Sequence, residues 1–355
     1  MMKESTTILK PLKRISPSRY TSISKCPYRV VLANSYSFPL LPYPPANHLG
    51  NIIHECIRLF ITGKTGTNTE FDEMWNRLLA KEEKALKDMG FGFFTPLNQN
   101  IPGYTIKKLQ LKSQLERQNK VETQRDRKTD ISILAEQWLE AQDALIAGYA
   151  DMIINLNGYT KLSDFKSGQI LLEEGGVKEE YENQLKLYAY LYNETFGKYP
   201  DELSIIDLEN KEYSITFTVQ ECEKLAGRAR EALFEINNLI KNDKLEKLAK
   251  PDPENCQSCL YRPACNFYWS FSLPETDSVF RDIKGILTKV RQFRNGNLNI
   301  TLESDGKEVT VSQITNEHLP LLTDLIGKQV AFYNVKKEET TGSYRSLRTT
   351  KIYEA

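Results

Sequence analysis

The sequence predicts a mixed α/β core that carries a helical insertion and is followed by a small all-β barrel. Three observations support this fold class. Apolar runs flank a tight-turn signal at Asn157-Gly158, amphipathic stretches of helical period surround that hairpin, and the last part of the chain alternates apolar and polar residues. We expect the core to span residues 1–275 with its insertion at about 65–147, and the barrel to span 276–355.

The central hairpin brings charged side chains together. An Asn-Gly pair between two apolar runs is a strong signal for a two-residue turn, and Asn157-Gly158 as that turn sets Asp151 opposite Asp164. Lys166 lies two residues beyond Asp164, so strand alternation returns it to the same face. Facing carboxylates destabilise a sheet unless a cation compensates them, and carboxylate oxygens are the ligands that Mg²⁺ and Mn²⁺ prefer. The alternative is a surface hairpin with solvated charges.

Composition places the chain among ordinary globular proteins. It has 355 residues, of which 40% are hydrophobic and 26% charged, and its formal net charge is zero. This balance gives no overall electrostatic sign of nucleic-acid binding, although a local basic groove is compatible with a neutral total. No apolar stretch is long enough to span a bilayer, and the basic N-terminal segment lacks the apolar core of a signal peptide. We therefore expect a cytoplasmic protein with no membrane partner.

Two helices are expected beside the hairpin. Ile53, Ile57 and Phe60 recur at helical spacing, and His54 lies one position off that apolar stripe. Downstream, residues 177–197 have a helical apolar pattern in which Gln184 and Tyr188 are four apart and share a face.

One segment stays ambiguous in the sequence. Residues 133–148 fit a helix or two short strands equally well, because periodicity alone does not separate them. Glu136 lies in this segment as a further acid, and we leave it outside the expected ligands.

The cysteines give a second signal. Cys256-x-x-Cys259 followed by Cys265 places three thiols in one short loop. Three sulfur ligands leave a tetrahedral ion or a cluster one ligand short, and Cys26, in its own Cys-Pro element, could be the fourth. The alternatives are a structural zinc site or uncoordinated thiols. Disulfides are not expected in a reducing compartment.

The C-terminal part has the strand order of an OB barrel. Three strands with turns at Asn295-Gly296 and Asp305-Gly306, a short helix over 315–326 and two further strands follow in sequence. OB barrels bind single strands by stacking bases on aromatic residues in a basic groove. The expected DNA-binding residues are Arg291, Phe293, Tyr333, Lys336, Tyr344 and Arg345. The alternative is a barrel that packs on the core or docks a partner.

Taken together, residues 20–270 resemble the RecB-type branch of the PD-(D/E)XK nuclease superfamily. The similarity extends to its iron–sulfur members, AddB-like and CRISPR-associated iron–sulfur exonucleases. The motifs that carry it occur in order: Cys26-Pro27, His54, the GYAD ending at Asp151, the DFK of Asp164 to Lys166, Gln184-x-x-x-Tyr188, and the loop of Cys256, Cys259 and Cys265. Asp164 stands where many members of the superfamily have Glu.

The resemblance implies a restriction-endonuclease-like core and specific residue roles. The resemblance implies that His54, Asp151 and Asp164 bind the catalytic Mg²⁺ or Mn²⁺, with the Phe165 carbonyl as a further ligand. Lys166 orients the attacking water or stabilises charge on the phosphate, while Gln184 and Tyr188 act on the DNA side of the site. The resemblance also favours a [4Fe–4S] cluster over zinc at the four cysteines.

The expected function is hydrolysis of DNA phosphodiesters, by an exonuclease acting on single strands or ends. The alternative is a catalytically silent single-strand-binding or adaptor protein that uses the nuclease fold as a scaffold, and a third reading is a zinc-stabilised structural protein. There is no glycine-rich phosphate loop and no helicase motif, so any motor would be a separate partner in a repair or defence complex. The sequence does not indicate digestion polarity or oligomeric state, nor does it separate repair, phage defence and CRISPR adaptation.

Overall fold

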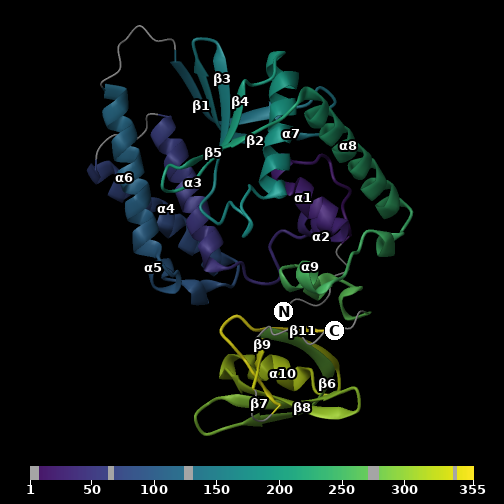
Figure 1. The fold of residues 1–355 in the computed structure, drawn as a ribbon. Helices are drawn as coiled ribbons and strands as arrows, with labels where there is room; N and C mark the ends of the chain where they lie inside the picture. The colour runs from purple at the N-terminus through teal and green to yellow at the C-terminus, as the bar shows by residue number, and fades with distance from the viewer. Residues whose placement is uncertain (1–7, 63–67, 124–130, 271–279, 339–341) are drawn as a thin grey trace. The chain divides into compact units, whose positions relative to one another are not determined.

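The computed structural model describes residues 8–62, 68–123, 131–270, 280–338 and 342–355 (Figure 1). Its packing divides the chain into two units. The larger unit comprises Lys10–Val31 and Pro44–Leu248, and the barrel unit comprises Met1–Leu9, Leu32–Tyr43 and Ala249–Ala355. Residues 249–270 fall in the same unit as the barrel strands.

A five-stranded sheet forms the centre of the larger unit. Its order is β1-β2-β3-β4-β5, and all neighbours are antiparallel except β3 and β4. The strands are β1 (Ile131–Glu140), β2 (Ala147–Leu156), β3 (Tyr159–Phe165), β4 (Glu202–Ile206) and β5 (Glu212–Ile215). The segment that was ambiguous in the sequence therefore belongs to two strands, the end of β1 and the start of β2, which a turn over residues 141–146 connects.

The hairpin between β2 and β3 has the register that the sequence predicts. Leu156 pairs with Tyr159 and Met152 with Ser163. Asn157 and Gly158 both have positive φ, 50° and 89°, which is the backbone that a two-residue turn of this kind requires. Continuing this register by one pair sets Asp151 opposite Asp164.

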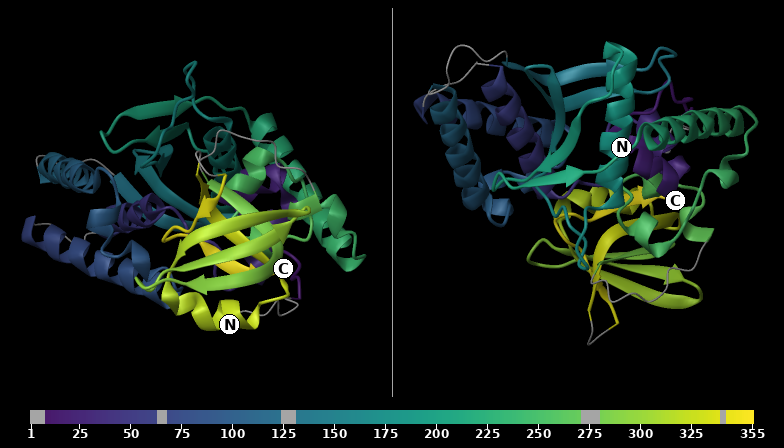
Figure 2. Two further views of the ribbon diagram at one scale, coloured as in Figure 1. Left: turned by 90° about the horizontal axis from the view of Figure 1, so that it is seen from below. Right: turned by 45° about the horizontal axis from the view of Figure 1, so that its top comes forward.

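Helices flank the sheet in two groups (Figure 2). The first group is α3 (Pro45–Ile61), α4 (Asn68–Asp88), α5 (Leu97–Asn100) and α6 (Tyr104–Thr123). Its buried side chains, with Trp75 among the most enclosed, share a core with Met152 and Phe165 of the sheet. The second group is α1 (Pro17–Lys25), α7 (Glu179–Phe196) and α8 (Val219–Lys241), in which α7 packs against both of the others. A further helix, α2 (Pro27–Ser35), follows α1.

The C-terminal strands form the predicted barrel. The strands are β6 (Phe280–Gln292), β7 (Leu298–Ser304), β8 (Lys307–Ile314), β9 (Gln329–Lys337), β10 (Tyr344–Arg345) and β11 (Lys351–Glu354), with α10 (Leu319–Asp324) between β8 and β9. β10 and β11 are two halves of one interrupted fifth strand, because both pair with β9 and β10 also pairs with β8 in parallel. This pairing closes the five-stranded barrel in the order of an OB fold.

A buried ion pair fixes the cysteine-bearing segment to the barrel. Helix α9 (Pro253–Gln257) leads into the 3₁₀ turn Arg262–Ala264. The Arg262 guanidinium is 2.5 Å and 3.2 Å from the two carboxylate oxygens of Asp282 on β6, and it also donates to the Cys259 carbonyl at 2.9 Å. Both side chains are at least 93% enclosed, so the pair depends on these hydrogen bonds for compensation.

In the described part of the chain, no helix has the length and apolar character needed to cross a membrane.

Candidate active site

The first acid lies where the β2–β3 ladder opens. The last backbone pair is Met152 with Ser163. Beyond it, the Asp151 carboxylate replaces a backbone carbonyl as hydrogen-bond acceptor. Its Oδ2 accepts a hydrogen bond from the backbone N–H of Phe165 at 2.9 Å. The side chain of Asp151, in the middle of β2, is thereby held against the end of β3.

The second acid is buried and held from α7. Asp164 is 2% exposed, and its Oδ1 accepts a hydrogen bond from Nε2 of Gln184 at 2.8 Å. Lys166 Nζ lies 2.6 Å from Asp164 Oδ2 and donates to Gln184 Oε1 at 3.2 Å. Gln184 thus connects the acid and the lysine of the D-x-K motif, and the structure brings together these three residues that the sequence predicted.

His54 joins the site from α3. Its Nδ1 lies 3.4 Å from Asp151 Oδ2. Burial alone would lower the pKa of His54, but the hydrogen bond and the charge of Asp151 outweigh it, so this pKa is raised. A histidine distant in sequence therefore faces the first acid, as the resemblance implies.

The pKa values of the two acids are shifted in opposite directions. Burial, and after it the charge of Asp151, raise the pKa of Asp164 to about 6, against the opposing effect of Lys166. Burial acts in the same direction on Asp151, but His54 and the Phe165 N–H stabilise its carboxylate and leave the pKa of Asp151 lowered. The pKa of Lys166 is raised, because its two neighbouring carboxylates outweigh its burial. The site therefore holds an ionised Asp151 and a more easily protonated Asp164.

Tyr188, on α7, packs against β2 next to Gly148. It is 4% exposed, and burial raises its pKa strongly. Its Oη lies 3.1 Å from the position that a Cβ on Gly148 would occupy, so the glycine of the GYAD motif lets the ring approach the strand. Because the ring is enclosed, its evident role in this structure is packing, and contact with a substrate stays a prediction.

Glu136 is an acid that the sequence analysis left outside the site. It lies across from Asp151, between the pairs Ala135–Met152 and Gln137–Ala150, and its φ of 50° is unusual for a non-glycine residue in a strand. Burial and the charge of Asp151 raise the pKa of Glu136, which places its carboxyl near the first acid. The signal was available only once residues 131–140 were known to be a strand paired with β2.

The donor chemistry of the site suits a divalent cation. Among the described residues, no three His, Cys, Asp or Glu side chains already converge as an ion-binding group. However, His54, Asp151 and Asp164 supply one imidazole and two carboxylates, which are donor groups that Mg²⁺ and Mn²⁺ accept. These three residues would hold Mg²⁺ or Mn²⁺. The Phe165 carbonyl stays a predicted ligand.

Coordination of a cluster or an ion by the cysteine residues stays a prediction. No disulfide joins any of the six, and Cys256 and Cys259 are 8% and 7% exposed. Short turns connect them, since the Cys259 N–H donates to the Cys256 carbonyl and the Cys265 N–H to the Arg262 carbonyl.

The expected DNA-binding residues of the barrel separate into different environments. The expectation of an exposed ring at Tyr333 is wrong: the residue is 1% exposed, because it packs against Tyr268, Trp269 and Tyr353. Phe293 is 38% exposed with the Arg291 guanidinium 4.9 Å from its ring centroid. Lys336, Tyr344 and Arg345 are half-buried.

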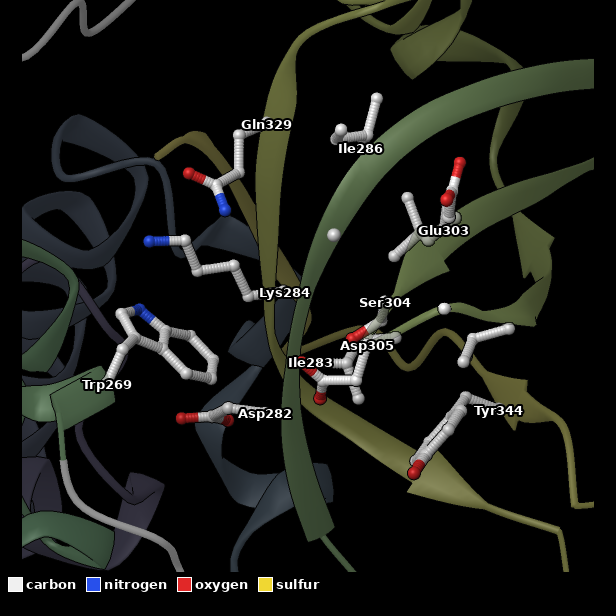
Figure 3. A pocket seen from close by; sticks show the side chains of 14 residues that line it. Trp269, Asp282, Ile283, Lys284, Ile286, Glu303, Ser304, Asp305, Gln329 and Tyr344 are labelled. Atoms are coloured by element: carbon white, nitrogen blue, oxygen red, sulfur yellow. The ribbon is translucent and has the colours of Figure 1, made fainter.

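Tyr344 also lines a cavity of about 680 Å³ in the barrel unit (Figure 3). Trp269 and Lys284 line the same cavity, together with the β7–β8 turn at Asp305-Gly306.

Two opposed acids, the lysine of an acid–x–lysine strand and a glutamine of α7 thus come together where the β2–β3 ladder opens. The chain belongs to the PD-(D/E)XK nuclease superfamily, whose model matches residues 14–266. No curated protein matches the sequence significantly.

Two solved structures are distantly similar. One is a candidate exonuclease from Eubacterium rectale, with 12% identity, a TM-score of 0.40 and coverage of 68% of this chain and 88% of that one. The other is a murine DNA-binding protein bound to double-stranded DNA, with 7% identity, a TM-score of 0.19 and coverage of 64% and 99%. Both similarities are too low to carry an argument.

Proposed function

We propose that the protein is a divalent-metal-dependent deoxyribonuclease of the RecB-type branch. The observation that carries this proposal is the meeting of Asp151 and Asp164 at the open end of one hairpin, with Lys166 Nζ 2.6 Å from Asp164. Superfamily membership supports phosphodiester hydrolysis as the reaction class.

Each residue has a distinct task in this chemistry. A divalent cation, when bound, lowers the pKa of a water ligand and polarises the phosphate. The Asp151 and Asp164 carboxylates would hold that cation together with His54. Lys166 places a full positive charge where negative charge develops on the phosphate, and Gln184 keeps both the lysine and Asp164 in position.

The proposed substrate is DNA, as single strands or as ends, and the barrel is a second contact surface. Phe293 with Arg291 supplies an exposed ring and a cation, which is the combination that single-strand-binding barrels use. The competing function is a silent adaptor that binds single-stranded DNA without cutting it.

A digestion assay tests the proposal. We expect the wild-type chain to degrade labelled single-stranded DNA with Mg²⁺ or Mn²⁺, and to be inert with a chelator. Asp164→Ala and Lys166→Ala should each lose at least about 100-fold in rate, because each removes a group that acts on the reacting phosphate. Lys224→Ala, an exposed lysine on α8, is the matched control. An inert wild-type chain would favour the adaptor, and unchanged cutting by both site variants would refute the assignment of Asp164 and Lys166 to the active site.

We also propose that Cys256, Cys259 and Cys265 are ligands of a [4Fe–4S] cluster. Cys26 is the proposed fourth ligand, on the sequence resemblance. The anaerobically purified protein should absorb broadly near 400 nm, and Cys256→Ser should abolish that band. A colourless protein that contains one zinc per chain would instead identify the zinc alternative.

A further inference from the structure

Two ammonium groups contact the ring of Tyr181 beside the acids. Lys166 Nζ is 4.9 Å from the ring centroid and Lys178 Nζ is 5.9 Å from it. Tyr181 lies in the first turn of α7, three residues before Gln184, and Lys178 is the residue that precedes the helix. The elements that deliver the catalytic lysine and the glutamine therefore also bring a second lysine to the same aromatic ring.

Backbone hydrogen bonds fix this arrangement. The Lys178 N–H donates to the Ile170 carbonyl at 3.1 Å, and the Tyr181 N–H donates to the Lys178 carbonyl at 2.9 Å. The loop after Lys166 thus closes on itself, with Lys178 beside Ile170, before α7 begins. The position of Lys178 next to the site is set by the fold and does not depend on its flexible side chain alone.

The two lysines differ in what holds them. Lys166 is committed to Asp164 and Gln184. For Lys178, no carboxylate among the described residues lies within ion-pair distance, and the contact found for its ammonium is the face of Tyr181. The ring quadrupole attracts an ammonium that lies over the aromatic face, so this contact orients the group without neutralising its charge.

Two of the three glutamates in the first turn of α7 have other partners. Glu179 accepts a hydrogen bond from Asn183 at 3.3 Å, and Glu180 lies 3.8 Å from Lys25. Both are therefore turned toward partners of their own. What remains at the start of α7 is an oriented cation beside a site that already contains one.

We propose that Lys178 and Tyr181 form a subsite for the DNA phosphate adjacent to the scissile one. This inference rests on the proposed function. In it, Lys166 addresses the scissile phosphate and Lys178 the next phosphate of the same strand. Tyr181 is a positioning residue that keeps the two ammonium groups apart and aimed at the strand. The ligand class is a backbone phosphodiester, so the subsite recognises DNA without reading its sequence.

Binding without a divalent ion tests the subsite independently of cutting. The probe is a fluorescein-labelled single-stranded oligonucleotide, titrated by anisotropy in chelator over a series of salt concentrations. Lys178→Gln should weaken binding several-fold and reduce the slope of log K against log salt by about 0.7, the value for one phosphate contact on a single strand. Lys224→Gln removes the same charge from an exposed position on α8 and should keep the wild-type slope.

Two variants of the tyrosine separate positioning from simple packing. Tyr181→Phe keeps the aromatic face and should retain wild-type binding, slope and kcat. Tyr181→Leu removes the face and should reduce the salt slope as Lys178→Gln does, and also lower kcat through Lys166. Circular dichroism melts verify that each variant is folded.

The outcomes distinguish this inference from the proposed function. If the wild-type chain cuts DNA but Lys178→Gln keeps the wild-type affinity and slope, the subsite is refuted and the nuclease stands. If Lys178→Gln loses affinity and slope while the wild-type chain never cuts, the phosphate contact is supported and the nuclease proposal fails. Equal loss in Lys178→Gln and Lys224→Gln would also refute the subsite, because any lysine would then suffice.

Discussion

Replacing Asp282 with alanine should strongly destabilise the barrel unit, although the change removes only a small side chain. The Asp282 carboxylate accepts hydrogen bonds from Arg262, from the Tyr268 hydroxyl at 2.7 Å and from the Asn334 N–H at 2.8 Å. Removing it leaves the Arg262 guanidinium, whose side chain is 7% exposed, as an uncompensated buried charge. Breaking a buried pair in this way costs about 3–5 kcal/mol. We therefore expect Asp282→Ala to lower the free energy of unfolding of this unit by that amount.

Hydrogen exchange followed by mass spectrometry measures this effect locally. A loss of 3 kcal/mol corresponds to about 100-fold faster exchange through unfolding, because each 1.4 kcal/mol is a factor of ten. The acceleration should appear in peptides from β6 and β9. Glu303→Ala on β7, an exposed position, is the control and should change stability by no more than about 0.5 kcal/mol. If Asp282→Ala exchanges like that control, the ion pair does not hold the cysteine segment to the barrel as argued.

Two further predictions concern the larger unit. In Gly148→Ala, the new methyl group would lie 3.0 Å from Pro17 Cδ and 3.1 Å from Tyr188 Oη. We therefore expect urea unfolding to show a free energy of unfolding that is lower by about 1–3 kcal/mol. Wild-type stability would show that the Tyr188 ring moves freely. The pKa of Asp164, about 6, lies above the ordinary 3.8, so the folded metal-free chain retains a proton that the unfolded chain releases. Its free energy of unfolding should therefore fall as the pH rises from about 4 to about 6, whereas Asp164→Asn should lack this dependence.

The hairpin was predictable because its information is local. The Asn157-Gly158 turn fixes the register, and the register alone determines that Asp151 and Asp164 face each other. The barrel was predictable for the same reason, because its turns and its strand alternation are local features of the sequence.

Other parts of the site required the folded chain. Whether residues 131–140 were strand or helix depended on pairing with β2, so the position of Glu136 opposite Asp151 was not visible in the sequence. The burial of Tyr333 likewise follows from rings that come from separate segments, Tyr268 and Tyr353. The cation–π contact of Lys178 depends on the path of the loop before α7.

The most direct test of the central claim is binding of Mn²⁺ to the chain by isothermal calorimetry, with DNA cutting measured on the same samples. The account predicts that the wild-type protein binds Mn²⁺ and cuts, and that Asp151→Asn and Asp164→Asn each weaken the ion's affinity at least about tenfold and stop the cutting in parallel. Undiminished Mn²⁺ affinity in both variants, or cutting that survives them, would contradict the assignment of the two aspartates as the ligands of the catalytic ion.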